Sequence, residues 1–388
     1  GGKDPPKTVF RGGFGVFYER FSEGLTLQTI RFDGVHQQQF FVTDPAILDP
    51  VVFTLDGVSN VPTVDQLAAF AQPQSIRVVA PDLRSPYTLQ FVASIERQLP
   101  YKTTVSATYT HSRTRRMLRS RNINAPINGV RPDPLTGNVF QYEATGRFDQ
   151  NLLIINFRTN FVEAVSIFGN YSISRARSDT DGSGTFPANS YDLNNEYGDA
   201  AQDIRHRFTI GGNFEPFWGI RLSPFVTFRT GVPFNITTGD DDNDDAVFTD
   251  RPAFAVSLSE ADIIATPFGL LDPTPEPGDI IVPRNFGRGP KFFNVNLRIA
   301  KEFGFGETAK SGGGDDNDEE SRFTLELSAQ IRNLFNHTNG GTPVGNLRSD
   351  FFGLSTSLAG GFGGGGGGGF GGSSAGNRRI RFEISFGF

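Results

Sequence analysis

Apolar and polar residues alternate strictly at the end of the chain, in the stretch RRIRFEISFGF at 378–388. Ile380 and Phe382 are large and apolar, whereas Arg381 and Glu383 between and after them are charged. Successive side chains of a strand point to opposite faces, so this pattern predicts a strand with one apolar and one polar face. The pattern alone does not say what the apolar face contacts.

The same alternation recurs along the whole chain. The alternating segments are 8–18, 86–98, 103–113, 150–159, 164–177, 205–215, 219–238, 292–304, 322–336 and 378–388, with a weaker one at 138–146. Together they predict an all-β chain of about ten strands. Several run to the length of about 9–11 residues that a tilted strand needs to cross a bilayer. Strands of soluble proteins are typically shorter, at about 5–6 residues.

Short and long connections take turns between these segments. Tight turns are expected near 99–102, 161–163 and 215–219. Long connections are expected at 19–85, 114–149, 178–204, 239–291 and 337–377. Outer-membrane barrels have short periplasmic turns and long extracellular loops, so this rhythm predicts an antiparallel transmembrane β-barrel segment. With the long loops outside, the last strand runs toward the periplasm and places Phe388 at the periplasmic rim.

Two connections are of low complexity. The segment at 305–321 falls where a short turn is expected, but it is long, acidic and rich in glycine. We predict that it is a disordered insertion. The segment at 360–376 is a Gly-rich low-complexity loop on the long-loop side. Both join strands rather than domains.

Composition changes this interpretation little. The mean hydropathy is −0.29, and no apolar run approaches the roughly 20 residues of a transmembrane helix. Barrel strands are apolar on one side only, so the low hydropathy is also what a membrane barrel shows. The chain has no Cys, which excludes disulfides and Cys-ligated zinc. Its net charge of −6 gives no footprint for nucleic acid.

Six stretches resemble one family in their order along the chain. They are RGGFGVFYERF (11–21), SPYTLQFVASIERQLP (85–100), DIRHRFTIGGNFEP (203–216), RTGVPFNITTGDDDNDDAVFTDRP (229–252), RNFGRGPKFFNVNLRIAKEFGF (284–305) and LELSAQIRNLFNHTN (325–339). On these residues the chain resembles the C-terminal part of the β-barrel of a TonB-dependent receptor, of the Oar-like kind with a carboxypeptidase-regulatory-like domain. That family has barrels of 22 strands filled by a plug. Residues 1–388 are therefore expected to form roughly the last half of such a barrel, without plug, TonB box or N-terminal domains, and no signal peptide is visible at the start.

The resemblance implies a function and a set of partners. The expected function is energised uptake of a bulky nutrient, an oligosaccharide, peptide or metal chelate, across the outer membrane of a Gram-negative-type bacterium. The expected partners are outer-membrane lipid, the outer-membrane assembly machinery, the unknown nutrient, and the TonB complex through the missing N-terminal part. Phe386 and Phe388 are similar to the terminal aromatic signal by which the assembly machinery recognises its clients.

An acidic stretch, GDDDNDDAVFTD at 239–250, is the sharpest candidate for a metal site. Its oxygen-bearing candidates are Asp241, Asn243, Asp245 and Asp250. Spacing at i, i+2 and i+4 brings oxygens together as calcium loops do. Ala246 and Pro252 stand where an EF-hand has Gly and Glu, so the stretch is not an EF-hand. It is either a calcium loop of another kind or a solvated acidic loop; no other cofactor is expected.

Arginine dominates the basic residues, with 30 Arg among the 36 Lys and Arg. Charged residues on the polar side of the strands are predicted to face the barrel lumen. They are Arg158, Arg221, Arg229, Arg298, Glu326, Arg332 and Arg381. Guanidinium groups form ladders with carboxylates or hold anionic ligands, so a structural lumen network and substrate contact both remain open.

An enzyme is not expected. The stretch GSSAG at 372–376 matches the G-x-S-x-G nucleophile elbow, but it lies in a glycine tract without the strand and helix that the motif needs. Two alternatives to an energised transporter stay open. One is a passive porin-like small barrel whose first strand closes on its last. The other is a soluble β-sandwich surface protein that binds calcium or carbohydrate.

Overall fold

The computed structural model describes most of the chain. The described residues are 7–35, 40, 42, 44–54, 57–67, 75–162, 164–258, 262–306, 322–359 and 376–388. The predicted insertion at 305–321 lies outside them except for Phe305 and Gly306. The predicted Gly-rich loop at 360–376 lies outside them except for Gly376.

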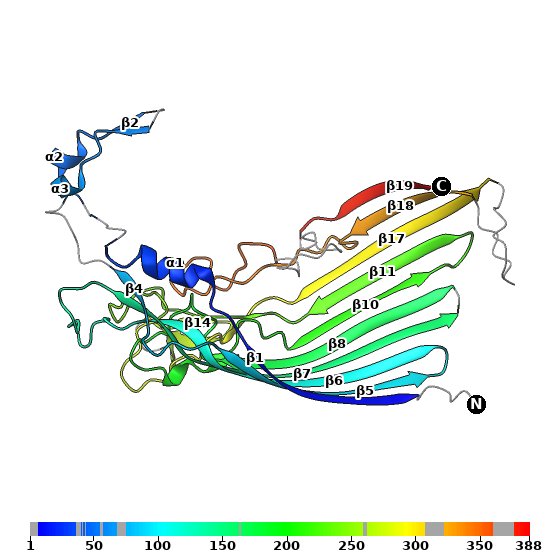
Figure 1. The fold of residues 1–388 in the computed structure, drawn as a ribbon, viewed down its shortest axis with the longest axis horizontal. Helices are drawn as coiled ribbons and strands as arrows, with labels where there is room; N and C mark the ends of the chain where they lie inside the picture. The colour runs from blue at the N-terminus through cyan, green and yellow to red at the C-terminus, as the bar shows by residue number, and fades with distance from the viewer. Residues whose placement is uncertain are drawn as a thin grey trace.

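Ten long strands form one antiparallel sheet, which confirms the predicted fold class (Figure 1). In sheet order they are β1 (Thr8–Tyr18), β5 (Tyr87–Leu99), β6 (Thr103–Asn122), β7 (Val139–Val162), β8 (Val165–Ser178), β10 (His206–Phe214), β11 (Ile220–Arg229), β17 (Phe292–Phe305), β18 (Phe323–Arg332) and β19 (Arg379–Gly387). Neighbours in the sheet follow one another in the order of the long strands along the chain. Because the long strands form one sheet rather than two packed sheets, the sandwich interpretation is wrong.

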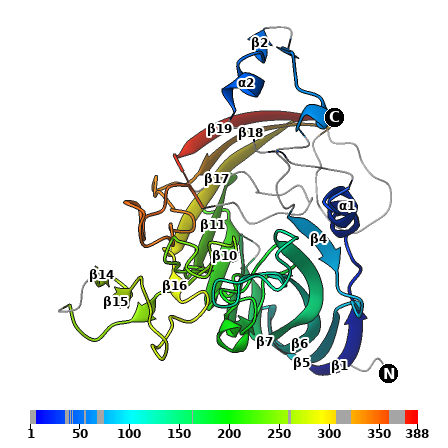
Figure 2. The same ribbon diagram turned by 90° about the vertical axis from the view of Figure 1, so that its left-hand side faces the viewer.

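The sheet curls into an arc whose two ends are β1 and β19 (Figure 2). Within the described ranges, β1 pairs with β5 alone and β19 pairs with β18 alone. The arc is therefore open, and each end presents an unpaired strand edge.

The register gives the sheet an apolar face and a polar face. Phe14 lies opposite Phe91, and Ile384 lies opposite Leu327, all on the apolar face. These side chains are exposed, and Phe382 on the same face is 78% exposed. Since apolar side chains of a water-soluble sheet would be covered, this face is suited to contact lipid.

The tight turns lie at the end of the sheet that also holds both termini, and the long connections lie at the other end (Figure 1). In the β5–β6 turn, Tyr101 and Lys102 have φ values of 60° and 49°, and in the β10–β11 turn Trp218 and Gly219 have 55° and 65°. Positive φ at two successive residues gives a turn whose twist matches that of the strands it joins.

Four strands differ clearly from their predicted bounds. β6 continues to Asn122 beyond the predicted 113, so the connection expected at 114–149 is shorter than predicted. The weak segment at 138–146 and the one at 150–159 form a single strand, β7. The segment at 219–238 is not one strand, because β11 ends at Arg229 and the short β12 (Pro233–Phe234) pairs elsewhere. A Cβ on the intervening Gly231 would overlap the carbonyl oxygen of Gly289, so only glycine fits where the chain leaves the sheet. β18 ends before the predicted 336 because Asn333 takes a φ of 54°.

The long connections carry short elements of their own. They are α1 (Glu23–Arg31), α2 (Pro45–Leu48), β2 (Val52–Thr54), β3 (Gly57–Ser59), α3 (Val64–Leu67), β4 (Ile76–Val79), η2 (Asn194–Glu196), β9 (Gly198–Asp199), β13 (Ala253–Phe254), β14 (Ile264–Thr266), β15 (Gly269–Asp272) and β16 (Gly287–Arg288). Among the described residues, no helix has the length and apolarity needed to cross a membrane.

The connections at 230–291 and 333–359 pack together around a core of their own. The buried members of this core are Phe234, Ile236, Leu271, Val282 and Leu347. Nearby, Arg251 and Glu196 form an ion pair of 2.7 Å, with side chains only 2% and 3% exposed. We call the connections at 123–138, 179–205, 230–258, 262–291 and 333–359 the loop platform. It is a packed structure rather than a set of separate loops.

Candidate binding site in the loop platform

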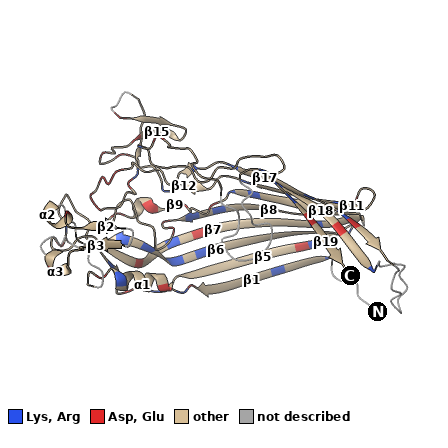
Figure 3. Ribbon diagram, turned by 90° about the horizontal axis from the view of Figure 1, so that it is seen from above, with Lys and Arg blue, Asp and Glu red and all other residues tan. Residues whose placement is uncertain are grey.

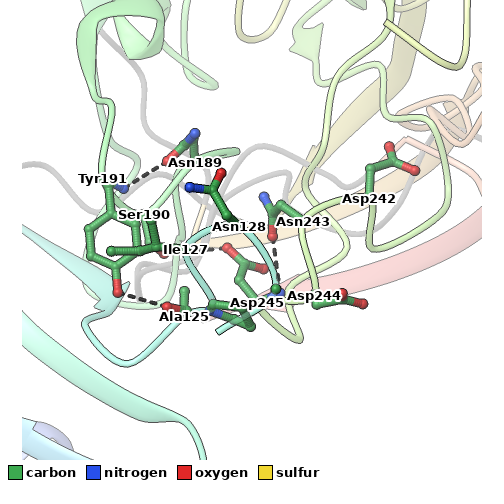
Figure 4. A pocket seen from close by; sticks show the side chains of 12 residues that line it. Ala125, Ile127, Asn128, Asn189, Ser190, Tyr191, Asp242, Asn243, Asp244 and Asp245 are labelled. Carbon is green, nitrogen blue, oxygen red and sulfur yellow. Dashed lines mark hydrogen bonds between the residues drawn. The ribbon is translucent and has the colours of Figure 1, made fainter. Parts of the chain in front are cut away.

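A cavity of about 390 Å³ opens where three connections of the loop platform meet (Figure 4). It is lined by Ala125, Pro126, Ile127, Asn128, Gly129, Asn189, Ser190, Tyr191, Asp242, Asn243, Asp244 and Asp245. Residues 125–129 follow the end of β6, residues 189–191 lie between β8 and β9, and residues 242–245 belong to the predicted acidic loop. The cavity is therefore built from parts that are far apart in the sequence.

Asn122, the last residue of β6, holds the three connections together and is fully buried. Its Nδ2 donates to the carbonyl of Asp245 at 2.8 Å and to Asn138 Oδ1 at 2.9 Å. Its backbone N–H donates to Ser190 Oγ at 3.3 Å, and Ser190 in turn donates to Asp245 Oδ2 at 3.3 Å. An unsatisfied buried amide is costly, so these bonds fix how the connections meet.

Tyr191 forms one side of the cavity, with its ring exposed and its hydroxyl tied down. The hydroxyl donates to the carbonyl of Ala125 at 2.8 Å. The side-chain oxygen of Asn189 accepts the backbone N–H of Tyr191 at 2.8 Å. Burial raises the pKa of the Tyr191 hydroxyl above its ordinary value, so it stays protonated at neutral pH. The ring is thus held in place with one face open to a ligand.

The acidic loop forms the opposite side and uses most of its oxygens on itself. The Asp241 carboxylate accepts the backbone N–H groups of Asp245 and Ala246 at 2.9 and 2.8 Å. Asn243 donates to the carbonyl of Ala188 at 2.8 Å and to Asp250 Oδ1 at 2.9 Å. These bonds explain the i, i+2, i+4 spacing as local capping of a tight loop.

The four predicted calcium ligands, Asp241, Asn243, Asp245 and Asp250, do lie in one loop. Within the described ranges, however, no three His, Cys, Asp or Glu side chains converge so that they could hold a metal ion. Calcium binding at 239–250 stays a prediction.

Two buried carboxyls of the acidic loop, Asp245 in the cavity and Asp250 outside its lining, have raised pKa values. Burial is the main cause that raises the pKa of Asp245 to about 6, and the charge of Asp241 contributes to the same change. Burial likewise raises the pKa of Asp250 to about 7. A buried carboxylate is disfavoured relative to its neutral form, which is the physical cause of both changes.

Hydrogen-bonding groups face the cavity from all three connections. The amides of Asn128 and Asn243 line it together, and Asp242 and Asp244 are exposed at its edge (Figure 4). Ile127 adds an apolar contact beside the Tyr191 ring. Such a lining can bind a ligand that carries several hydroxyl or amino groups.

The residues predicted to face the lumen all lie on the polar face of the sheet, away from this cavity. Arg298 forms an ion pair with Glu326, and Arg221 pairs with Glu215 at 2.7 Å. Arg229 lies over the ring of Phe292 at 5.2 Å. The register places Arg158 opposite Phe168, Arg332 opposite Arg379, and Arg381 opposite Gln330. They are spread along the wall rather than gathered into one site.

The predicted assembly signal lies at the end of the sheet with the tight turns. The Phe386 ring contacts Phe305, Phe323 and Phe388, with centroid separations of 6.0, 5.9 and 6.3 Å. Phe388 is 96% exposed. The terminal aromatic is therefore anchored through Phe386 while its own ring stays accessible.

Sequence reasoning missed the residues that line the cavity from outside the acidic loop, namely Asn128, Asn189, Ser190 and Tyr191. The turn-forming stretch PING at 126–129 indicates a loop tip there, but nothing in it indicates a partner. The contact that joins the cavity walls, between Asn122 and Asp245, spans 123 positions of sequence.

Comparison with known proteins gives the family. Residues 3–362 match the model of the outer membrane beta barrel domain family, so the chain belongs to that family. No curated protein matches the chain. The apolar face of the sheet therefore contacts lipid, and the protein is located in the outer membrane.

Three solved structures are among those similar to the chain. The outer membrane transporter YddB from Escherichia coli is 11% identical, with a TM-score of 0.46, and the match covers 85% of this chain and 35% of YddB. The FrpB iron transporter from Neisseria meningitidis is 9% identical, with a TM-score of 0.39, and the match covers 80% of this chain and 32% of FrpB. The ferric-catecholate import receptor Fiu from E. coli is 9% identical, with a TM-score of 0.35, and the match covers 66% of this chain and 24% of Fiu. The chain thus spans about a third or less of these proteins.

Proposed function

We propose that this chain, a member of the outer membrane beta barrel domain family, is part of the barrel of a receptor that takes up a bulky nutrient with energy from the TonB complex. The observation that carries the proposal is the pair of open edges at β1 and β19. Inside a bilayer an open edge leaves backbone N–H and C=O groups without partners, so we infer that further strands complete the barrel. A barrel larger than these ten strands has room for a plug, as the Oar-like resemblance implies.

The cavity in the loop platform is the proposed point of first contact with the nutrient. Asp242 and Asp244 at its edge repel anions, whereas its amides and the Tyr191 ring suit hydroxyl and amino groups. Among the three expected ligand classes, this chemistry favours an oligosaccharide or a peptide with free amines over an anionic metal chelate.

A conductance measurement separates this proposal from the passive porin. The full-length protein is reconstituted in planar bilayers, and steady-state current is recorded without added ligand. A plugged receptor shows no steady open channel, because the lumen is filled. A large steady conductance that rises in proportion to the salt concentration would instead establish a porin.

The binding role of the cavity is tested on cells that display the full-length protein. Arrays of neutral oligosaccharides and of amine-bearing peptides serve as probes, and capture is compared before and after the double change Asp242→Asn/Asn243→Ala. We expect about a tenfold loss of capture on one array, corresponding to about 1.4 kcal/mol. Glu276→Gln, an exposed residue of the same platform outside the cavity, is the matched control. Equal capture by the double variant and the wild type would contradict a binding role.

A further inference from the structure

The apolar face changes character where β6, β7 and β8 approach the loop platform. Toward the tight turns this face carries Tyr109, Leu153 and Ile173, which lie on neighbouring strands. Toward the platform the same face carries five arginines. They are Arg113, Arg115, Arg147, Arg175 and Arg177, which we call the arginine belt.

The register shows that these side chains share the apolar face. Arg113 lies opposite Asp149, and Asp149 lies opposite Arg177 on the next strand. Arg175 lies opposite Asn151, one pair nearer to the apolar residues. Side chains alternate between faces along a strand, so positions separated by two share a face. Figure 3 shows basic segments on β6 and β7 gathered toward the loop end of the sheet.

Three members of the belt are exposed on the outer face of the wall, whereas Arg115 and Arg177 are partly buried. The side chains of Arg113 and Arg147 are 53% and 52% exposed, and Arg175 is also exposed. The neighbouring positions on the polar face, Ser174 and Ala176, are buried. The guanidinium groups of Arg113, Arg147 and Arg175 are therefore accessible from the lipid side, whereas Arg177 Nη2 donates to the carbonyl of Tyr197 at 3.2 Å.

Positive charge exceeds negative charge on this patch. Asp149 pairs with Arg113 at 3.1 Å and with Arg115 at 3.2 Å. The Arg147 guanidinium lies 3.7 Å from Asp179, whose carboxylate also accepts the backbone N–H of Arg147 at 2.7 Å and pairs with the buried Arg119 at 3.0 Å. The side chain of Arg175 makes no ion pair or hydrogen bond within the described ranges. Asp149 and Asp179 together cannot neutralise five guanidinium groups.

Tyr197 orders two of the arginines in advance. Its ring lies under the guanidinium groups of Arg147 and Arg177, at 4.3 and 4.5 Å from the ring centroid. Its hydroxyl donates to Asp149 Oδ2 at 3.4 Å. Stacking on an aromatic ring limits the freedom of a guanidinium but leaves its N–H edge free, so less entropy is lost when that edge binds an anion.

We propose that the arginine belt binds the phosphate groups of an anionic glycolipid in the outer leaflet of the outer membrane. The belt lies directly beyond the lipid-facing apolar residues, on the side of the long extracellular loops, which is the height of the outer headgroups. Guanidinium forks match the geometry of phosphate oxygens, and the surplus of charge provides the attraction. The inference requires only that the barrel lies in the outer membrane, so it holds for a receptor and for a porin alike.

The test uses the full-length protein in detergent and three kinds of vesicle. They contain lipopolysaccharide, enzymatically dephosphorylated lipopolysaccharide, or phosphatidylcholine. The belt variant is Arg147→Gln/Arg175→Gln. Arg175→Gln alone is a second variant, which removes a charge without breaking an ion pair or a side-chain hydrogen bond. Arg20→Gln/Arg348→Gln removes the same charge elsewhere and is the matched control.

We expect the double variant to bind lipopolysaccharide vesicles about tenfold more weakly than the wild type, which corresponds to about 1.4 kcal/mol. Arg175→Gln should show a smaller loss, and the control variant should bind like the wild type. Dephosphorylation should remove the difference between wild type and variant. Equal binding of all four proteins would overturn the proposal, and so would an equal loss on phosphatidylcholine. Complete displacement of the glycolipid by inorganic phosphate would reassign the belt to a free anion.

Discussion

Phe residues and Arg–Glu pairs occur both in the ten-stranded sheet, which we call the wall, and in the loop platform, but their burial differs between the two regions. Phe382 in the wall is 78% exposed, whereas Phe234 in the platform is 5% exposed. Arg298 and Glu326 pair on the partly open polar face of the wall, whereas Arg251 and Glu196 pair in the interior of the platform. The solvent accounts for the difference, because the wall contacts lipid and the platform stands in water.

Stability should therefore depend on different terms in the two regions. The wall is held by backbone hydrogen bonds between strands, and its apolar side chains need lipid rather than a protein core. The platform is held by its own apolar core and by buried ion pairs such as that between Arg251 and Glu196. A change that is severe in one region should be mild in the other.

The largest effect is expected from a charge placed in the core of the platform. Leu271 is fully buried in that core, so Leu271→Asp would bury a carboxylate without a partner. We expect the platform to open while the wall stays assembled. Limited proteolysis of whole cells should cut the platform loops at least tenfold faster, whereas the protein should still migrate differently when boiled and unboiled. Leu258→Asp, at an exposed position, is the control. Unchanged proteolysis would contradict a packed platform.

A large effect on assembly is expected at the opposite end of the wall. Phe388→Asp would remove the exposed terminal ring, with little effect on the Phe386 cluster that anchors it. We expect the amount of protein in the outer membrane to fall severalfold, because the assembly machinery no longer recognises the terminus. Immunoblots of membrane fractions give the readout. Phe351→Asp, exposed in the platform, should leave that amount unchanged. Normal amounts of the Phe388→Asp variant in the outer membrane would contradict the predicted role of Phe388 in assembly.

A moderate effect should follow pH in the platform alone. The pKa of Asp250 rises from 3.8 to about 7 on folding, so the folded platform binds this proton more tightly than the unfolded one. Stability should be highest below the ordinary pKa and should fall as the pH rises toward about 7, by at most about 1.4 kcal/mol per unit. Proteolysis of the platform should therefore be faster at neutral pH than in mild acid. Asp250→Asn should flatten this dependence, and a steeper profile in that variant would contradict it.

The smallest effect is expected from an ion pair in the wall. Arg298→Gln removes a partly exposed pair with Glu326, and such pairs contribute about 0–1 kcal/mol. Arg251→Gln in the platform leaves Glu196 buried without its partner, which costs about 3–5 kcal/mol. Urea unfolding of the full-length protein, with the wall followed by heat-modifiability and the platform by proteolysis, should separate the two. Equal losses of stability in the two variants would contradict the difference proposed between the wall and the platform.

The same contrast decides what the sequence could predict. The wall follows a local rule, and the predicted strand at 8–18 matches β1, Thr8–Tyr18, because side chains alternate within the strand. The end of β11 was missed because it depends on the approach of Gly231 to Gly289, which is not local. The cavity was missed for the same reason, since Asn122 and Asp245 meet only in the folded platform.

The arginine belt lies between these two cases. Arg113 ends the predicted strand at 103–113, whereas Arg115 falls in a predicted connection, and the structure shows that both lie on β6 on the same face as Tyr109. Only the register shows that Arg147 and Arg175 on neighbouring strands join the same patch. A charge pattern on one strand becomes a surface through strand pairing.

Cysteine cross-linking across strand edges tests most directly whether this sheet is part of a larger barrel. The chain has no native Cys, and the measurement uses the full-length protein in the membrane with any other cysteines removed. Ser328→Cys/Glu383→Cys joins registered partners on β18 and β19 and should cross-link readily. Gly13→Cys on β1, combined with Cys at successive positions of β19, should give no cross-link, because other strands lie between these edges. A disulfide between β1 and β19 would mean that the ten strands close on themselves, and the proposed receptor barrel would have to be abandoned.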